Sequence, residues 1–142
     1  MKRILCFGDS NTWGAVPGGT RWDRLPYEQR WTGRLQALLG DGYELIEEGC
    51  CGRTTVLDDP AADGRNGLRV IVSLLESHRP LDLVIVFLGT NDLKHRYQMT
   101  ACDVAAGLTR LLKCIQGYPC GYGAVDTPQI LVVSPTWITE NA

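Results

Sequence analysis

The chain has 142 residues, of which 44% are hydrophobic and 21% charged, and this balance predicts one globular domain with a core. Its net charge is −2 and its 14 basic residues are scattered, so the sequence indicates neither a nucleic-acid surface nor a strongly charged partner. The apolar run that follows the basic start, Ile4 to Phe7, is too short for a signal peptide core. No apolar run approaches the roughly 20 residues that cross a bilayer, so we expect no membrane partner.

The first half of the chain predicts two strands and one helix. Residues 3–8 are mostly apolar without alternation, which is typical of a buried strand in a parallel sheet. From 27 to 39, apolar residues recur at helical spacing, and Pro26 and Gly40 lie where a helix usually begins and ends. Residues 43–46 predict a short second strand.

The second half predicts two more helices and two more strands. A helix is expected at about 64–77, followed by the most apolar stretch of the chain, 81–88, which predicts a central strand. Thr100 and Asp103 match a capping box at the start of a third helix. Residues 129–133 predict a fourth strand.

The alternating order of strands and helices predicts the fold class. It favours an α/β fold with a parallel sheet, helices on both faces and right-handed crossovers. A flavodoxin-like strand order is one solution, and periodicity does not distinguish it from related orders. Because the sequence has no internal repeat and no low-complexity segment, we expect residues 1–142 to form one domain.

The six cysteines form no CxxC pair and have no histidine at zinc-ligand spacing. Cys6 lies in the first predicted strand, where a thiol behaves as a small apolar group, whereas adjacent Cys50 and Cys51 leave a redox role open. Asp58 and Asp59 lack a third ligand, so we interpret them as solvated loop residues. We therefore expect a cytoplasmic protein with reduced thiols, no metal and no cofactor.

Polar clusters follow the first three predicted strands, at the sheet edge where open α/β folds bind ligands. Gly8 is expected to allow a sharp turn by adopting backbone angles that a Cβ forbids. This turn would direct Ser10 into the crevice, although an Asp-Ser pair after glycine is also typical of a helix cap or a simple turn. We expect Asp9 to accept backbone N–H groups and Asn11 to hold the turn. The clusters are GDSN at 8–11, GCCGRTT at 49–55 and GTND at 89–92.

Together these clusters contain the parts that a serine nucleophile requires. An attacking serine needs hydrogen-bond donors aimed at the oxyanion that develops on the carbonyl. The N–H groups of Ser10 and Gly52 are two candidate donors, and the side-chain amide of Asn91 is a third. Gly52 suits this role because a residue without a side chain lets substrate approach its backbone.

The clusters also resemble the sequence blocks of a known family. GDSN, the glycine before RTT, and GTND are similar to the first three blocks of SGNH (GDSL-type) hydrolases. The arylesterase and acyltransferase branch is the most similar, through FGDSNTWG, EEG with GRTT, DDP, LDLVIVFLGTND and LVVSP, and the match covers residues 3–135. The resemblance implies a flavodoxin-like three-layer α/β/α sandwich. It also implies that Ser10 is the nucleophile, and that its N–H, the N–H of Gly52 and the Asn91 amide form the oxyanion hole.

The resemblance further implies a catalytic His and Asp, which this family takes from a D-x-x-H block after a fifth strand. We expect this chain to contain no D-x-x-H spacing and to lack the last strand and helix, so that 1–142 would be C-terminally incomplete. Of the two histidines, His78 is expected in a structural role at the sheet edge opposite the crevice. His95 follows the Asn91 loop and is a minor candidate for the base.

Other residues near the clusters have two interpretations each. Trp13 and Asn11 are predicted to contact substrate, with Trp13 lining the acyl pocket, and ordinary packing is the alternative for Trp13. Arg53 is expected to pair with Glu47 or Glu48, which would make its role structural.

The sequence therefore predicts a serine esterase that hydrolyses small short-acyl or aryl esters through an acyl-enzyme and also transfers the acyl group to alcohols. A carbohydrate or acetyl-ester deacetylase is the alternative within this class. A catalytically inactive fragment or a binding module with this fold is the alternative from another class. The expected partners are a small-molecule ester and, at the apolar edge of the fourth strand, a second copy of the chain or a complementary C-terminal segment.

Overall fold

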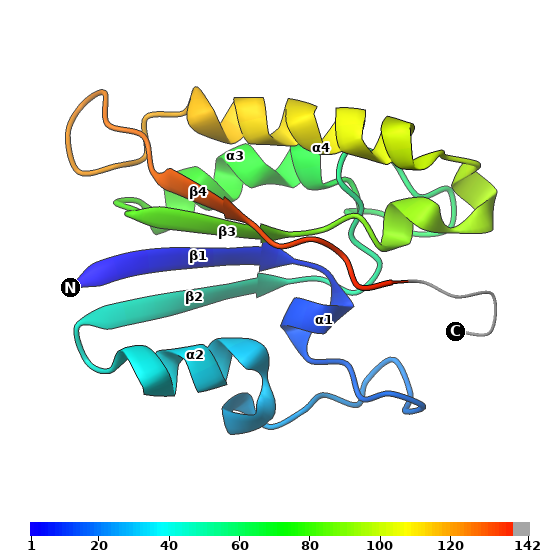
Figure 1. Ribbon diagram of the computed structural model, residues 1–142, viewed down its shortest axis with the longest axis horizontal. Coiled ribbons are helices and arrows are strands. Elements are labelled where there is room, and N and C mark those ends of the chain that lie inside the picture. The colour runs from blue at the N-terminus through cyan, green and yellow to red at the C-terminus, as the bar shows by residue number, and fades with distance from the viewer. Residues whose placement is uncertain (138–142) are drawn as a thin grey trace.

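A four-stranded parallel sheet runs through the centre of the protein, whose computed structural model describes residues 1–137. The strand order is β2-β1-β3-β4 (Figure 1), which is the flavodoxin-like order for the strands present. The strands are β1 (Lys2–Gly8), β2 (Tyr43–Gly49), β3 (Leu83–Phe87) and β4 (Gln129–Val132).

Helices cover both faces of this sheet. Helix α2 (Trp31–Leu39) lies on one face, and α3 (Gly67–His78) and α4 (Ala101–Gln116) lie on the other (Figure 1). This arrangement confirms the predicted α/β/α sandwich with a parallel sheet. Within residues 1–137, no helix has both the length and the apolar character needed to cross a membrane.

The side chains of β1 enter two apolar layers alternately. Leu5 and Phe7 pack in the larger core beneath α3 and α4, whereas Ile4 and Cys6 pack in the smaller core on the α2 side. Both sets are buried, which explains why the strand is apolar without alternation. Burial raises the pKa of the Cys6 thiol to about 12, so this cysteine stays a neutral apolar group as predicted.

The predicted elements are present, with some boundaries shifted. Strand β2 is longer than predicted because it stays paired with β1 until Gly8 lies opposite Gly49. The helix expected at 27–39 is divided: Tyr27–Gln29 form a short 3₁₀ helix, η1, and α2 begins only at Trp31.

Capping side chains set the starts of the two helices on the other face. Helix α3 begins later than predicted, at Gly67, because the side chain of Asn66 accepts the N–H of Leu68. Helix α4 begins after Thr100, which forms the predicted capping box with Asp103.

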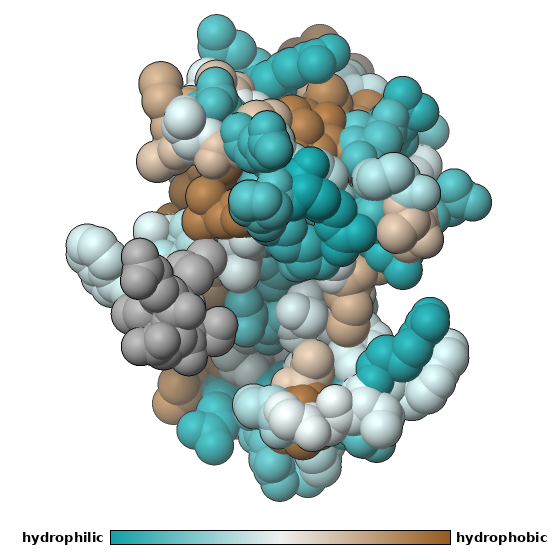
Figure 2. Space-filling view, turned by 90° about the vertical axis from the view of Figure 1, so that its right-hand side faces the viewer, coloured by the Kyte–Doolittle hydropathy of each residue, from teal (hydrophilic) through white to brown (hydrophobic). Residues whose placement is uncertain are grey.

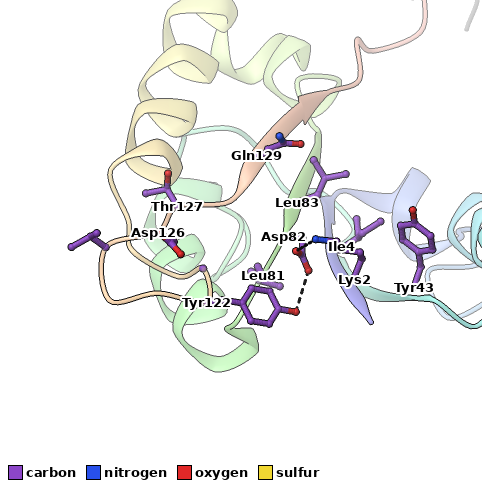
Figure 3. Close-up of a pocket in the computed structure, with 12 residues that line it drawn as sticks. Lys2, Ile4, Tyr43, Leu81, Asp82, Leu83, Tyr122, Asp126, Thr127 and Gln129 are labelled. Carbon is purple, nitrogen blue, oxygen red and sulfur yellow. Dashed lines mark hydrogen bonds and ion pairs between the residues drawn. The ribbon is translucent and has the colours of Figure 1, made fainter.

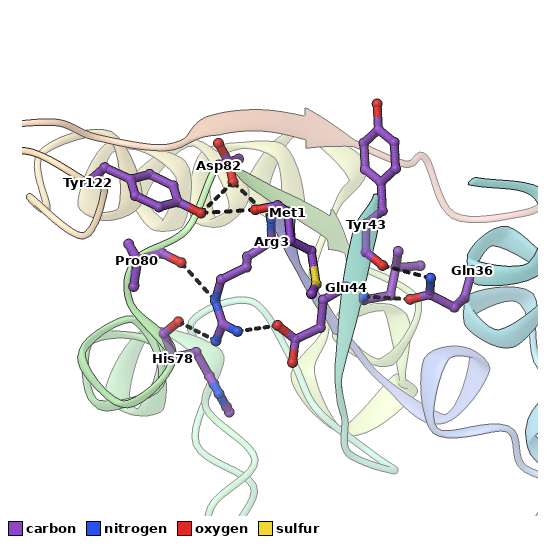
Figure 4. A network of polar contacts seen from close by, with 10 residues as sticks. Met1, Arg3, Gln36, Tyr43, Glu44, His78, Pro80, Asp82 and Tyr122 are labelled. Carbon is purple, nitrogen blue, oxygen red and sulfur yellow. Dashed lines mark hydrogen bonds and ion pairs between the residues drawn. The ribbon is translucent and has the colours of Figure 1, made fainter. Parts of the chain in front are cut away.

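At the amino ends of the strands, Arg3 connects β1 to its neighbours (Figure 4). Its Nε donates to the carbonyl of Pro80 at 3.0 Å, and one of its terminal nitrogens donates to the carbonyl of His78 at 3.1 Å. The other terminal nitrogen pairs with Glu44 of β2. These bonds hold the carboxyl end of α3 at this end of the sheet, so the polar loops after the strands lie at the opposite end.

Candidate active site

The three polar loops meet because β1, β2 and β3 end level with one another. Gly8, the last residue of β1, lies opposite Gly49 on one side and Phe87 on the other. Figure 2 shows this end of the molecule, where the surface is hollowed between an upper and a lower part, with mostly teal and white residues around the hollow. The convergence predicted from the sequence is therefore present.

Ser10 is the first residue of a four-residue helix, α1 (Ser10–Trp13), that follows β1 directly. The carboxylate of Asp9 accepts the N–H of Asn11 at 2.9 Å and caps this helix, as predicted. The helix ends at Gly14, whose N–H donates to the Ser10 carbonyl at 2.9 Å. Ser10 is half-buried at the carboxyl end of the sheet.

The reason for a glycine at position 8 differs from the one predicted. Gly8 does not have a positive φ, so the turn does not depend on backbone angles that only glycine tolerates. Instead, a Cβ at this position would lie 2.1 Å from Oγ1 of the buried Thr12 and 3.1 Å from the carbonyl oxygen of Phe87. Gly8 is therefore needed for space, because α1 folds back closely against the end of β1.

The second loop places Gly52 in a conformation that favours glycine. Its φ is +81°, in the left-handed region, so a side chain here would strain the backbone. The next residue, Arg53, is buried and does not pair with the carboxylates of Glu47 or Glu48, so the predicted partners are wrong. Its guanidinium donates instead to the main-chain carbonyls of Glu48 at 2.6 Å and Gly8 at 3.2 Å.

The correction for Arg53 has a geometric cause. The carboxylates of Glu47 and Glu48 on β2 bond other side chains: Glu47 pairs with Arg30 at 2.8 Å, and Glu48 contacts the ring of His78 at 2.8 Å. The Arg53 guanidinium also lies over the ring of Phe7, 4.5 Å from its centre. Its role is structural, as predicted, but it acts by joining the ends of β1 and β2.

The third loop brings Asn91 to the other two. Asn91 begins a short 3₁₀ helix, η2 (Asn91–Leu93), and is buried. Its Nδ2 donates to the carbonyl of Arg53 at 3.0 Å and lies 3.5 Å from a carboxylate oxygen of Asp9. The amide therefore stands between the loop of Ser10 and the loop of Gly52.

Asp92 supplies a further connection that the sequence did not predict. Its buried carboxylate accepts the N–H of Thr55 at 3.0 Å and the hydroxyl of the same residue. Burial raises the pKa of Asp92, and the two bonds from Thr55 oppose that shift. The sequence could have indicated this bond, because GTND ends in an acidic residue and RTT ends in two residues with hydroxyl groups. The sheet brings these two loops together, and a carboxylate and a hydroxyl there are suited to bond each other.

The backbone donors expected to bind an oxyanion have no acceptor. Among residues 1–137, neither the N–H of Ser10 nor the N–H of Gly52 donates a hydrogen bond. In the same loops, the N–H of Cys50 donates to Gly8 at 3.1 Å and the N–H of Arg53 donates to Cys50 at 3.1 Å. The two donors thus stay available beside the Asn91 amide, although their role in catalysis stays a prediction.

Neither histidine forms a hydrogen bond with Ser10 within residues 1–137. His78 lies at the end of α3 and its ring bonds Glu48, which agrees with the structural role expected for it. His95 is exposed and begins another short 3₁₀ helix, η3 (His95–Tyr97).

One D-x-x-H spacing does occur in the sequence, at Asp92 and His95. The expectation that no such spacing exists is therefore wrong. The two side chains do not bond each other among the described residues, because Asp92 is buried against Thr55 while His95 is exposed. This pair does not have the contacts of a catalytic His and Asp, and the expectation that these two groups lie outside the chain stays a prediction.

Two residues predicted to contact substrate lie on α1. Trp13 is half-buried, and the guanidinium of Arg24 lies over its ring at 5.0 Å while donating to its carbonyl at 2.6 Å. Asn11 is exposed at the start of the helix. Packing by Arg24 fits the alternative interpretation of Trp13, and contact of either residue with substrate stays a prediction.

Both members of the acidic pair Asp58 and Asp59 bond arginines, and the prediction of solvated residues is right for the exposed Asp58 and wrong for Asp59. Asp58 pairs with Arg69 at 3.0 Å, and Asp59 pairs with Arg96 at 3.1 Å, with only 6% of the Asp59 side chain exposed. Within residues 1–137, no group of three or more potential metal ligands comes together.

A hollow of about 730 Å³ lies at the amino ends of the strands, at the end of the sheet opposite Ser10 (Figure 3). Lys2 pairs there with Asp82 at 3.1 Å, and the hydroxyl of Tyr122 donates to the same carboxylate at 3.1 Å. These three polar groups bond each other, and the residues that line the hollow include no serine, cysteine or histidine. The chemistry therefore belongs to the opposite end of the sheet.

Comparison with known families agrees with this location. The model of the GDSL-like lipase/acylhydrolase family matches residues 6–141. The chain belongs to this family. The motif GDSL, which gives the family its name, corresponds to residues 8–11. The first three of these, Gly8, Asp9 and Ser10, match the motif, and Asn11 replaces the leucine.

Several solved structures are similar to this GDSL-like chain. A carbohydrate acetylesterase from Sinorhizobium meliloti is 46% identical and an aryl esterase from M. smegmatis is 45% identical; each has a TM-score of 0.88 and matches 95% of this chain. The chain spans 64% of the length of both structures. A lipase/acylhydrolase from Enterococcus faecalis, 22% identical with a TM-score of 0.62, matches 96% of this chain and 58% of its own, and shares the fold. The curated proteins include no match.

Proposed function

We propose that the protein is a serine esterase that hydrolyses small short-acyl or aryl esters through an acyl-enzyme, and that alcohols also accept the acyl group. The observation that carries this proposal is the convergence of Ser10 with two unengaged N–H groups and the Asn91 amide. Family membership and the similarity to an aryl esterase support it. We also propose the cytoplasmic location predicted from the cysteines, all six of which are free.

The proposed mechanism begins when Oγ of Ser10 attacks the ester carbonyl. The carbonyl oxygen becomes an oxyanion, which the N–H groups of Ser10 and Gly52 and the amide of Asn91 stabilise. The alcohol leaves with a proton, and water or a second alcohol then takes the acyl group from Ser10. A base must accept the serine proton, because an unassisted serine is a weak nucleophile. We propose that this base is a histidine, paired with an aspartate, that the 142-residue sequence does not contain.

Removal of the nucleophile tests this proposal. We expect Ser10→Ala to abolish hydrolysis of 4-nitrophenyl acetate, whereas Ser73→Ala, on the exposed side of α3, leaves the rate unchanged. His95→Gln is also expected to keep the rate, because this histidine is exposed and does not bond Ser10. A rate that Ser10→Ala leaves unchanged would show that Ser10 takes no part in hydrolysis, which would favour the inactive fragment or binding module with this fold.

A carbohydrate or acetyl-ester deacetylase is the second candidate function. It is favoured by the similarity to a carbohydrate acetylesterase at 46% identity. A panel of acetylated sugars compared with aryl acetates separates the two functions. Higher kcat/KM on the sugars would favour the deacetylase, and higher kcat/KM on the aryl acetates would favour the arylesterase.

A further inference from the structure

Two cationic side chains lie beside Gly52, in the loop proposed to bind the oxyanion. The position that a Cβ of Gly52 would occupy is 3.3 Å from Nε of Arg65 and 4.0 Å from Nζ of Lys94. The two cations come from different segments, since Arg65 precedes α3 and Lys94 follows η2. Both are partly buried, so water screens them less than it would at an exposed surface.

The backbone holds both residues in place. The carbonyl of Arg65 accepts the N–H of Thr54 at 2.8 Å, which ties this residue to the second site loop. The N–H of Lys94 donates to the carbonyl of Asn91 at 3.1 Å, which holds the backbone of Lys94 one turn after the candidate oxyanion amide. Their positions therefore follow from the same bonds that build the site.

Neither cation has a carboxylate partner within residues 1–137. The nearby carboxylates on this side of the molecule are taken by other arginines, Asp58 by Arg69 and Asp59 by Arg96. Arg65 uses one terminal nitrogen to donate to the carbonyl of Asp63 at 2.7 Å, which leaves its charge uncompensated. Lys94 also lies near enough to Asp59 to lower the pKa of that carboxyl, but neither Lys94 nor Arg65 forms an ion pair among residues 1–137, so both can bind an anion.

We propose that Arg65 and Lys94 bind a carboxylate carried by the ester substrate, so that the preferred substrates are anionic esters. This inference rests on the proposed esterase function and adds the substrate class. A carboxylate held beside Gly52 would place the neighbouring ester carbonyl close to the N–H groups of Gly52 and Ser10. A guanidinium and an ammonium together recognise a carboxylate well, because both donate charge-assisted hydrogen bonds.

Binding without turnover is the first test, because it does not depend on Ser10 or on a base. The probes are 4-hydroxybenzoate and its neutral analogue 4-hydroxybenzamide, and the measured quantity is the Kd from NMR shifts of the Gly52 amide. We expect the carboxylate to bind more tightly than the amide by about fivefold per cation, as for partly buried ion pairs. The preference should shrink in about 0.5 M salt, since salt screens such charges.

Charge-removing variants assign the preference to these two residues. Arg65→Gln and Lys94→Gln are each expected to reduce the carboxylate preference about fivefold while leaving the Kd of the amide unchanged. Arg110→Gln is the matched control, because Arg110 is an exposed cation on α4 without an ion pair among the described residues. It should change neither Kd.

Kinetics separate a failure of this inference from a failure of the proposed function. The substrates are 4-acetoxybenzoate and 4-acetoxybenzamide, which differ only in charge, with 4-nitrophenyl acetate as a neutral reference. A higher kcat/KM for the benzoate that falls in both variants supports the inference. Hydrolysis of all three at rates independent of charge, with equal Kd values for the two probes, would overturn the inference and leave the esterase proposal intact.

Discussion

Asn91 is the one side chain among the three candidate oxyanion donors, so its position depends on the residues that surround it. It is buried, and one of its amide hydrogens is engaged by the carbonyl of Arg53 at 3.0 Å. That bond and the 3.5 Å contact of Nδ2 with Asp9 fix the amide between the loop of Ser10 and the loop of Gly52. The sequence motif identified this residue, but only the structure shows that the loop of Gly52 holds it in place.

Truncation of this side chain is therefore expected to affect kcat more than KM. We predict that Asn91→Ala lowers kcat for 4-nitrophenyl acetate by about 10²- to 10³-fold, the usual effect of losing one oxyanion donor. Gln116→Ala, an exposed amide at the end of α4, is the control and should leave kcat unchanged. If Asn91→Ala raised KM alone, the amide would bind substrate rather than the oxyanion.

Asp92 and Asp103 make opposite predictions for stability against pH. Burial raises the pKa of Asp92 above 3.8, whereas the N–H of Thr100 lowers the pKa of the exposed Asp103 below 3.8. The contribution of Asp92 is thus full below the pKa of the unfolded chain and is lost as pH rises through the folded pKa. The contribution of Asp103 is present above the unfolded pKa and is lost as pH falls through the folded pKa.

Urea unfolding at several pH values measures both effects. Relative to the unmodified protein, the free energy of unfolding of Asp92→Asn should increase as pH rises from about 4 to 7. That of Asp103→Asn should decrease, relative to the unmodified protein, as pH rises from about 2 to 4. Parallel curves for the two variants would show that the two carboxyl groups do not differ in environment as described.

At the scale of the elements, the strands and main helices followed from periodicity, whereas the short helices did not. A buried strand such as β1 has a strong apolar signal, and the capping box at Thr100 marks the start of α4. Helix α1 has four residues, too few for a periodic pattern, and depends on the cap from Asp9. The close approach of α1 to Gly8 is likewise a tertiary contact that no local pattern contains.

The residues of the candidate site were predictable from the sequence, but their side-chain partners were not. The sheet topology brings three loops to one edge, so Ser10, Gly52 and Asn91 were identified before the structure. The partners of Arg53 and the bond between Asp92 and Thr55 were missed, because side-chain pairing between loops depends on three-dimensional distances.

The start of α3 connects helix packing to the site. A Cβ on Gly67 would lie 2.6 Å from the carbonyl oxygen of Thr54 and 3.0 Å from that of Thr55. We predict that Gly67→Ala lowers the free energy of unfolding by about 1–3 kcal/mol, the usual cost of overpacking, and reduces activity by displacing the Gly52 loop.

A second glycine provides the control for this prediction. A Cβ on Gly42, in the turn before β2, would have no heavy atom within 4 Å, so Gly42→Ala should change neither quantity. Chemical denaturation and esterase assays of the two variants make the comparison. Equal stability of Gly67→Ala and Gly42→Ala would contradict the close packing of α3 against the site loop.

At the scale of the whole molecule, the outer edge of β4 is unpaired among residues 1–137. Gln129 and Val133 donate their N–H groups inward to β3, so the alternation directs the N–H of Val132 outward. Leu131 and Val132 are 51% and 41% exposed. We propose that this edge pairs with a second copy of the chain or with a complementary C-terminal segment.

Val132→Pro tests this pairing, because proline removes one outward donor and is tolerated on an edge strand. Size-exclusion chromatography should show an associated protein that becomes a monomer in the variant, with an unchanged circular dichroism spectrum. A clean monomer before substitution would count against the proposal for a second copy.

The most direct test of the account is the reaction of the protein, purified as the cell makes it, with a fluorophosphonate. This probe attaches to a serine that a base has activated, so it requires no knowledge of the substrate. Intact mass and peptide mapping should show a single adduct on Ser10, absent in Ser10→Ala and retained in Ser73→Ala. An adduct on another residue, or no adduct on a protein that hydrolyses esters, would contradict the assignment of Ser10 as the nucleophile.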